Sequence, residues 1–201
     1  MSKQTYVSIL LVVFFICLAL SAIRPHDYFT WFLEVLPGIL LILVLIGTYR
    51  SFQFTSMTYT FIWLHMLILM IGGHYTYAEV PLFNWIQHEW GLDRNYYDRL
   101  GHFAQGFVPA LMAREILRRH VGVTKHGWLA VLVVSVCLAF SAFYELLEFL
   151  VARLTGTAAE AFLGTQGDVW DTQWDMTLAL IGAIAALFFS RIQDNAMKQQ
   201  S

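Results

Sequence analysis

Charged side chains are scarce in this 201-residue chain. Asp, Glu, Lys and Arg make up 13% of it, whereas a typical soluble domain has about 25%. Hydrophobic residues make up 58%, and the few charges are bunched, so that long apolar runs separate them. The net charge of −2 gives no reason to expect a nucleic-acid partner. This composition excludes an ordinary soluble domain and predicts an integral membrane protein.

Cysteines and known catalytic signatures are also in short supply. Cys17 and Cys137 both lie inside apolar runs, where cysteine behaves as a small hydrophobe. We therefore expect neither a disulfide nor a redox role. The sequence contains no P-loop, no G-x-S-x-G and no H-E-x-x-H motif. No organic cofactor and no particular enzyme class is indicated.

Six segments approach the length of about 20 apolar residues that a helix needs to cross the hydrocarbon. They predict an all-α, polytopic membrane helix bundle with about six transmembrane helices, which forms a single integral membrane domain over residues 1–201. The third segment is short, and the fourth and sixth carry polar residues. The segments are residues 6–23, 31–49, 57–72, 100–117, 128–151 and 172–189.

The first segment has an alternative interpretation as a signal peptide, because "ALSA" at 19–22 resembles a cleavage site. Its long apolar run, with only Lys3 before it, favours an uncleaved helix.

The distribution of Lys and Arg predicts the orientation, since cytoplasmic loops of membrane proteins carry the excess. With the N-terminus inside, eight basic residues fall on the cytoplasmic side and four on the outer side. The inner set is Lys3, Arg50, Arg114, Arg118, Arg119, Lys125, Arg191 and Lys198, and the outer set is Arg24, Arg94, Arg99 and Arg153. Both termini are therefore predicted to be cytoplasmic, in a multi-pass protein of a bacterial inner membrane.

Two outer loops follow from this topology. The loop at 73–99 contains "PLFNWIQHEWGL", whose apolar residues suggest a short helix lying in the interface. The Gly-, Ala- and Thr-rich segment at 155–168 is predicted to form the second loop. The chain ends in a polar stretch, "QDNAMKQQS".

Ionisable residues gather in three motifs that the topology places at the same depth, near the outer leaflet. "YYDRLGHFAQGF" opens the fourth helix, "FYELLEF" lies near the end of the fifth and "GDVWDTQWDM" opens the sixth. Spacings of three and four residues put the acids of each motif on one helical face. The nearby cations are fewer than the acids. The six acids are Asp98, Glu145, Glu148, Asp168, Asp171 and Asp175, and the cations are Arg94, Arg99, Arg153 and, if protonated, His102. Intramembrane charges tend to face the bundle interior or a water-filled cavity, so we expect one shared, outward-opening polar pocket.

Carboxylates with a single histidine favour Mg, Mn or Ca over structural zinc. The predicted metal ligands are Asp98, His102, Glu145, Glu148, Asp168, Asp171 and Asp175. Arg94 and Arg99 are predicted to contact the phosphate of a lipid or envelope headgroup, so that membrane lipid is the expected partner. In an enzymatic version His102 is the general acid or base, oriented by Asp98, while Glu145 and Asp175 hold metal or a proton.

Simpler interpretations exist for the individual residues. Asp168 is a candidate N-cap, with Asp171 in the first helical turn, but Asp175 lies two turns inside. Glu148 is a candidate solvated interfacial residue, and His65 is treated as structural. For the whole cluster, the alternatives are a proton- or ion-coupled transporter, which a homo-oligomer would help to complete, and a non-catalytic factor whose polar cluster joins helices. An excess of acids leaves buried charges unpaired, which destabilises contacts between helices. The excess therefore favours a binding site over a structural cluster.

The stretches "YDRLGHFAQGF", "FYELLEF" and "GTQGDVWDTQWDM" resemble the uncharacterised YjdF family of bacterial inner-membrane proteins over the full length of the chain. A fainter likeness, to the VanZ-like membrane family, covers the second half. Asp98, His102, Glu145, Asp175 and Gly182 fit that pattern, while Arg99, Glu148 and Ala179 replace its usual Lys, Gln and Asn. The resemblance implies that the three motifs form one unit and implies no established activity.

Overall fold

A computed structural model describes residues 1–156 and 160–199, and it is helical with no strand in these ranges. The helices are α1 (Lys3–Ser21), α2 (Tyr28–Thr48), α3 (Ser56–Tyr75), the 3-10 helix η1 (Tyr77–Glu79), α4 (Pro81–Trp90), α5 (Tyr97–Arg119), α6 (His126–Thr155), α7 (Glu160–Leu163), α8 (Asp171–Leu187) and α9 (Ser190–Lys198). The predicted all-α bundle is confirmed.

Each of the six predicted segments coincides with a long helix, within a few residues at either end. Helix α4 forms inside the loop predicted at 73–99. The loop predicted at 155–168 includes α7, and its residues 157–159 lie outside the described part of the chain. The polar C-terminal stretch, for which no helix was predicted, forms most of α9.

Four helices, α1, α2, α3 and α6, are long and apolar enough to cross a membrane. A fifth span is formed if α8 and α9 are counted as one element, which bends by 55° at the break between them. Helix α5 has 23 residues, which is long enough, but charged side chains lie near both of its ends. A count of six spans therefore remains a prediction that depends on α5.

The polarity of α5 follows from its position in the bundle. It packs most extensively on α8 and also contacts α6 and α3, and 14 of its residues are buried. Only a lipid-facing surface has to be apolar, so a helix surrounded by protein tolerates Asp98, Arg99, Arg114 and Glu115. The apolar content of the sequence alone therefore gives too weak a signal that such a helix spans the membrane.

The contact between α5 and α8 is unusually close at two glycines. A Cβ atom added to Gly106 would lie 1.8 Å from the carbonyl oxygen of Ala179, and one added to Gly182 would lie 2.1 Å from that of Phe103. Small residues let helix backbones approach in this way inside membranes. The close approach holds the polar N-terminal turns of α5 and α8 side by side.

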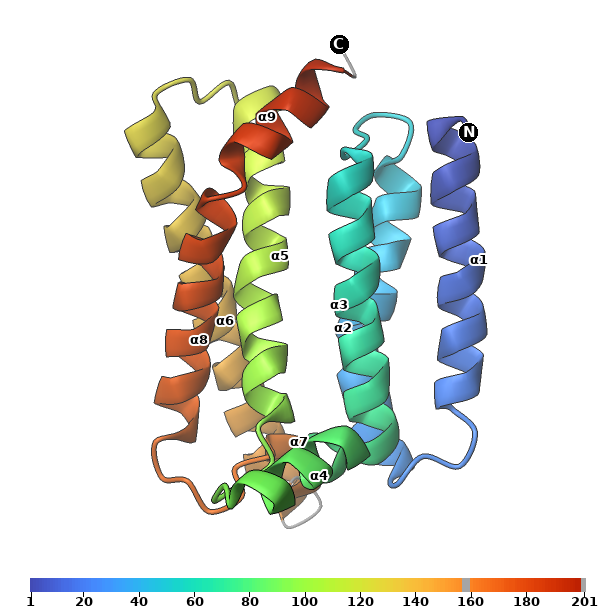
Figure 1. Ribbon diagram of the computed structural model, residues 1–201, viewed down its shortest axis with the longest axis vertical. Helices are drawn as coiled ribbons and strands as arrows, with labels where there is room; N and C mark the ends of the chain where they lie inside the picture. Colours follow the sequence, from blue (N-terminus) through green and yellow to red (C-terminus); the bar gives the residue numbers. More distant parts are fainter. Residues whose placement is uncertain (157–159, 200–201) are drawn as a thin grey trace.

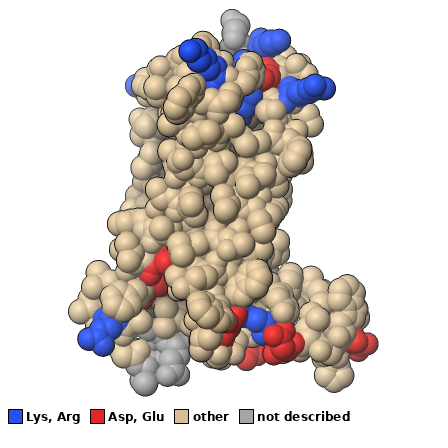
Figure 2. All heavy atoms as spheres, turned by 90° about the vertical axis from the view of Figure 1, so that its left-hand side faces the viewer, with Lys and Arg blue, Asp and Glu red and all other residues tan. Residues whose placement is uncertain are grey.

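The long helices run roughly parallel, α4 lies across one end of the bundle, and both termini lie at the opposite end (Figure 1). Lys and Arg side chains gather at the end that carries the termini, whereas most Asp and Glu visible in Figure 2 lie at the α4 end. Helix α4 has no buried residue, and Leu82, Trp85 and Trp90 on it are largely exposed. An exposed amphipathic helix across the end of a bundle suits a membrane interface.

A buried polar latch, made of Glu115, Thr55, Thr58, Gln193 and Arg114, fixes α9 across the terminal end of the bundle. Glu115 accepts hydrogen bonds from the Thr55 hydroxyl at 2.7 Å and the Thr58 hydroxyl at 2.5 Å. Gln193 of α9 accepts from Arg114 at 3.0 Å and donates to the carbonyl oxygen of Leu111 at 2.7 Å. Both Glu115 and Gln193 are fully buried, so this latch docks α9 through polar contacts.

Candidate functional site

Two buried arginines organise the polar residues at the α4 end. Arg99, in the first turn of α5, lies 2.8 Å from Asp171 and 3.0 Å from Asp168, and it also pairs with Asp175. Arg94, in the loop before α5, lies 2.9 Å from Asp171 and donates to the carbonyl oxygen of Gly164 at 3.0 Å. The N-terminal ends of α5 and α8 are thereby joined by charge-assisted contacts.

The loop before α5 is also tied to the loop before α8 by a pair of hydrogen bonds. The backbone N–H of Asn95 donates to Oε1 of Gln166 at 2.9 Å, and Nε2 of Gln166 donates to the Asn95 carbonyl at 2.9 Å. Gln166 has a positive φ of 48°, a conformation that costs free energy in a residue other than glycine. This pairing fixes where Arg94 enters the cluster.

His102 lies at the centre of the acidic groups. Its Nε2 atom is 3.3 Å from Oδ1 of Asp98 and 3.7 Å from Oδ1 of Asp175, and its Nδ1 atom is 3.8 Å from Oε1 of Glu145. One side-chain ligand atom from each of Asp98, His102 and Asp175 falls within 4.8 Å of the others. We call these three residues the triad. Two carboxylates and one imidazole at this separation form a geometry that a single metal ion can bridge.

Three atoms around the triad are buried and have no hydrogen-bond partner among the described residues. They are Oδ2 of Asp98, Nδ1 of His102 and Oε1 of Glu145. Buried polar atoms are normally paired, because leaving one unpaired costs about 1–3 kcal/mol. The three atoms lie around His102, so the described residues leave the polar groups at this point of the bundle incompletely paired.

A cavity of about 60 Å³ opens beside His102 between α2, α3, α5 and α6. Its polar lining includes Glu34, His65, Tyr77, Asp98 and Glu148. Burial raises the pKa of the Tyr77 phenol well above its ordinary value, so Tyr77 stays protonated and able to donate. A cavity of this size accommodates a water molecule or a small cation.

Glu34 of α2 was not among the predicted site residues, yet it is 5% exposed and lines this cavity. The signal that could have found it is a single acid in an otherwise apolar transmembrane segment, which is a functional indicator in itself. With Glu34 included, seven carboxyl groups face the two guanidinium groups of Arg94 and Arg99. His65, expected to be structural, also lines the cavity.

All the other predicted site residues fall in or beside this cluster. Asp98, Arg99 and His102 come from α5, Glu145 from α6, and Asp171 and Asp175 from α8, and all are buried. Glu148 is half-buried at the cavity rather than solvated at an interface. The structure thus brings the three sequence motifs together.

Two details differ from expectation. Asp168 is not the N-cap of α8, because that position is Trp170, whose backbone N–H donates to Oδ1 of Asp168 at 2.9 Å. Arg94 and Arg99, expected to hold a headgroup phosphate, are buried and pair with carboxylates. Their guanidinium groups act on aspartates inside the fold.

Comparisons with known proteins point to one family. The family model described as "Predicted membrane protein (DUF2238)" matches residues 6–195. Inner membrane protein YjdF of Escherichia coli (strain K12) is 51% identical over 169 residues, which cover 84% of this chain and 81% of that protein. No solved structure matches the chain.

Proposed function

Because this chain belongs to the DUF2238 family of predicted membrane proteins, we propose that it is a multi-pass inner-membrane protein that binds a divalent cation at the triad. The observation that carries the proposal is the set of three unpaired buried atoms, on Asp98, His102 and Glu145, around a triad of suitable size. An ion at the triad would contact Nε2 of His102, which faces Asp98 and Asp175, and it would add positive charge near the unpaired carboxylate oxygens of Asp98 and Glu145.

Charge balance supports a cation. Arg94 and Arg99 already pair with Asp168, Asp171 and Asp175, and they also lie 3.7 and 3.6 Å from Oδ2 of Asp98. Two guanidinium groups are thus shared among four aspartates, and among the described residues Glu34, Glu145 and Glu148 form no salt bridge with either arginine. Uncompensated buried charges are strongly destabilising. A divalent ion offsets two of them at once, and carboxylate with imidazole is a donor set suited to Mn, with Mg and Ca as alternatives.

The orientation follows from the charged ends of the bundle. Lys and Arg gather at the end that carries both termini (Figure 2), and in inner-membrane proteins that excess marks the cytoplasmic side. We therefore place the termini in the cytoplasm and the cation site at the periplasmic end. There it would meet lipid headgroups or other envelope substrates.

A role in envelope chemistry is consistent with this position. A metal ion held by the triad would offer its remaining coordination positions to a phosphate, while Arg94 and Arg99 hold the aspartates in place. The Nδ1 atom of His102 is free of hydrogen bonds within the described chain and faces Glu145. In an enzymatic version His102 would not coordinate the ion but would be the general acid or base, oriented by Asp98, while Glu145 and Asp175 hold the metal or a proton.

Transport through the bundle is less well supported. Between Gln105 in the site and Arg114 in the latch, α5 carries only apolar, glycine and proline residues. The buried residues that surround this stretch, such as Ile62, Met66 and Val133, form the hydrophobic core. Helix α5, which runs through the centre of the bundle, thus contributes no polar side chain to a path between the two ends.

Metal analysis of protein extracted in mild detergent tests the proposal. We expect about one Mn, Mg or Ca ion per chain, and we expect the added ion to raise the melting temperature, because a ligand at 100 times its Kd stabilises by about 2.7 kcal/mol. Asp175→Asn and His102→Gln should lose both effects.

Glu115→Gln is the matched control, because Glu115 is a buried carboxylate at the other end of the bundle. It should keep the ion. Wild-type protein without bound metal, or triad variants that bind as much as Glu115→Gln, would refute the cation site.

A further inference from the structure

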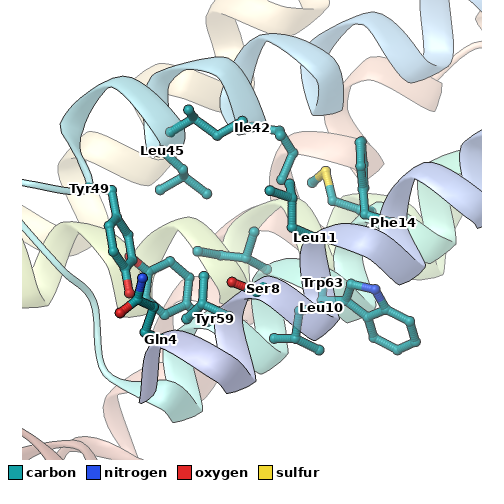
Figure 3. A pocket seen from close by; sticks show the side chains of 14 residues that line it. Gln4, Ser8, Leu10, Leu11, Phe14, Ile42, Leu45, Tyr49, Tyr59 and Trp63 are labelled. Atoms are coloured by element: carbon teal, nitrogen blue, oxygen red, sulfur yellow. The ribbon is translucent and has the colours of Figure 1, made fainter. Parts of the chain in front are cut away.

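A second cavity, far from the triad, lies between α1, α2 and α3 at the end of the bundle that carries the termini (Figure 3). Its volume is about 300 Å³, which is within the range of small-ligand sites. Its walls are mainly apolar and include Leu11, Phe14, Ile42, Leu45, Ile62 and Met66. We call it the α1–α2 groove.

The groove exists because α1 and α2 both pack along α3 and hardly contact each other. Helix α1 is the most lipid-exposed span, with only Phe14 and Ser21 buried along its length. The space between α1 and α2 is therefore at the depth of the hydrocarbon and beside it. Apolar side chains facing an empty space lose dispersion contacts, so a membrane component should fill it.

The two ends of the groove differ in polarity. Gln4, Ser8 and Tyr49 line the end nearest the N-terminus, whereas Phe14 lies towards the middle of the bundle (Figure 3). Lys3 and Arg50 are the chain neighbours of Gln4 and Tyr49. An apolar body with a polar mouth, at the end of the bundle where α1 begins at Lys3 and α2 is followed by Arg50, complements an amphiphile with a negative headgroup. Basic pockets between transmembrane helices on the cytoplasmic side bind anionic lipid headgroups in this manner.

We propose that the α1–α2 groove binds one acyl chain of an anionic phospholipid, whose headgroup lies beside Lys3 and Arg50. Burial of each methylene of the chain would add dispersion contacts with Leu11, Leu45 and Met66. The negative headgroup would be attracted by both basic side chains. This site is independent of the cation site, because it lies at the other end of the bundle.

Native mass spectrometry of delipidated protein tests the proposal with phosphatidylglycerol and phosphatidylethanolamine of the same acyl chains. Wild-type protein should retain one phosphatidylglycerol at least tenfold more strongly than phosphatidylethanolamine. Leu45→Trp, which fills the groove, should lose that lipid. Leu43→Trp is the matched control, since Leu43 lies on the exposed face of the same helix, and it should bind as wild type does.

Two further variants keep the test decisive if Leu45→Trp folds poorly. Leu11→Trp fills the groove from α1, with the exposed Val12→Trp as its control. The double variant Lys3→Gln/Arg50→Gln changes no residue that lines the groove and should bring the two lipids to equal retention. Equal retention by wild-type protein, unchanged lipid binding in both filled variants, or a lipid-free dimer that closes the groove would overturn the proposal.

Discussion

The Nε2 atom of His102 lies 3.7 Å from Oδ1 of Asp175, which joins α5 to α8 at the centre of the polar cluster. Asp175 also accepts from Arg99, so one carboxylate holds both a guanidinium group and an imidazole. The same residues therefore support the packing of two helices and create the proposed cation site. Stability and binding can be separated by the choice of variant.

Arg99→Met should be the most destabilising change in the cluster. Arg99 lies within 3.6 Å of four carboxylates, on Asp98, Asp168, Asp171 and Asp175, and its removal leaves them without that compensation. We expect a loss of about 3–5 kcal/mol in the free energy of unfolding, measured by denaturation in detergent. Arg153→Met, at an exposed position, should have little effect. Equal stability of the two variants would show that the ion pairs contribute nothing.

Gly106→Ala should weaken the contact between α5 and α8. Its new methyl group would meet the backbone of Ala179, which cannot move aside as a side chain does. Overpacking typically costs about 1–3 kcal/mol, and the bound ion should be lost as the two helices separate. In Gly127→Ala the added methyl group meets no atom within 4 Å, so this control should be neutral or slightly stabilising. Melting curves of the two variants that coincide would contradict the close approach.

Gln193→Ala should release α9 from the end of the bundle. The change removes the α9 partner of the Leu111 carbonyl and one of the two α9 partners of Arg114, which keeps Asp194 at 2.8 Å. Because unpaired buried polar groups cost about 1–3 kcal/mol, tryptic cleavage at Arg191 should become roughly tenfold faster. Asn195→Ala, at an exposed position of the same helix, provides the control. Unchanged cleavage would show that α9 is held by other contacts.

Cysteine labelling tests the predicted orientation. In a variant without Cys17 and Cys137, a membrane-impermeant maleimide should label Glu89→Cys on α4 in intact cells. It should label Asn195→Cys on α9 only after the membrane is opened. The physical basis is the excess of Lys and Arg at the end of the bundle that carries the termini. The reverse pattern would place the cation site on the cytoplasmic side.

Much of the fold was predictable because membranes impose a simple length rule. Apolar runs located α1, α2, α3 and α6, and the polar interruptions in 100–117 and 172–189 still allowed α5 and α8 to be recognised. Helix α9 was missed because its stability comes from Gln193 and Glu115, two residues that are distant in the chain. Glu34 carried a signal, as a single acid in an apolar segment, but its segment does not show that it shares a cavity with Asp98 and His102.

The sequence by itself determined that the chain is a helical membrane protein and that its charges fall at the ends of particular helices. Helical periodicity also placed Asp98 with His102, and Asp171 with Asp175, on common faces. Only the tertiary structure decided which charges neutralise one another. Arg94 and Arg99 turn inward to the aspartates, and atoms of Asp98, His102 and Glu145 remain unpaired. That outcome depends on the close approach of α5 to α8 at Gly106 and Gly182, a distance between helices that residue spacing along one chain cannot encode.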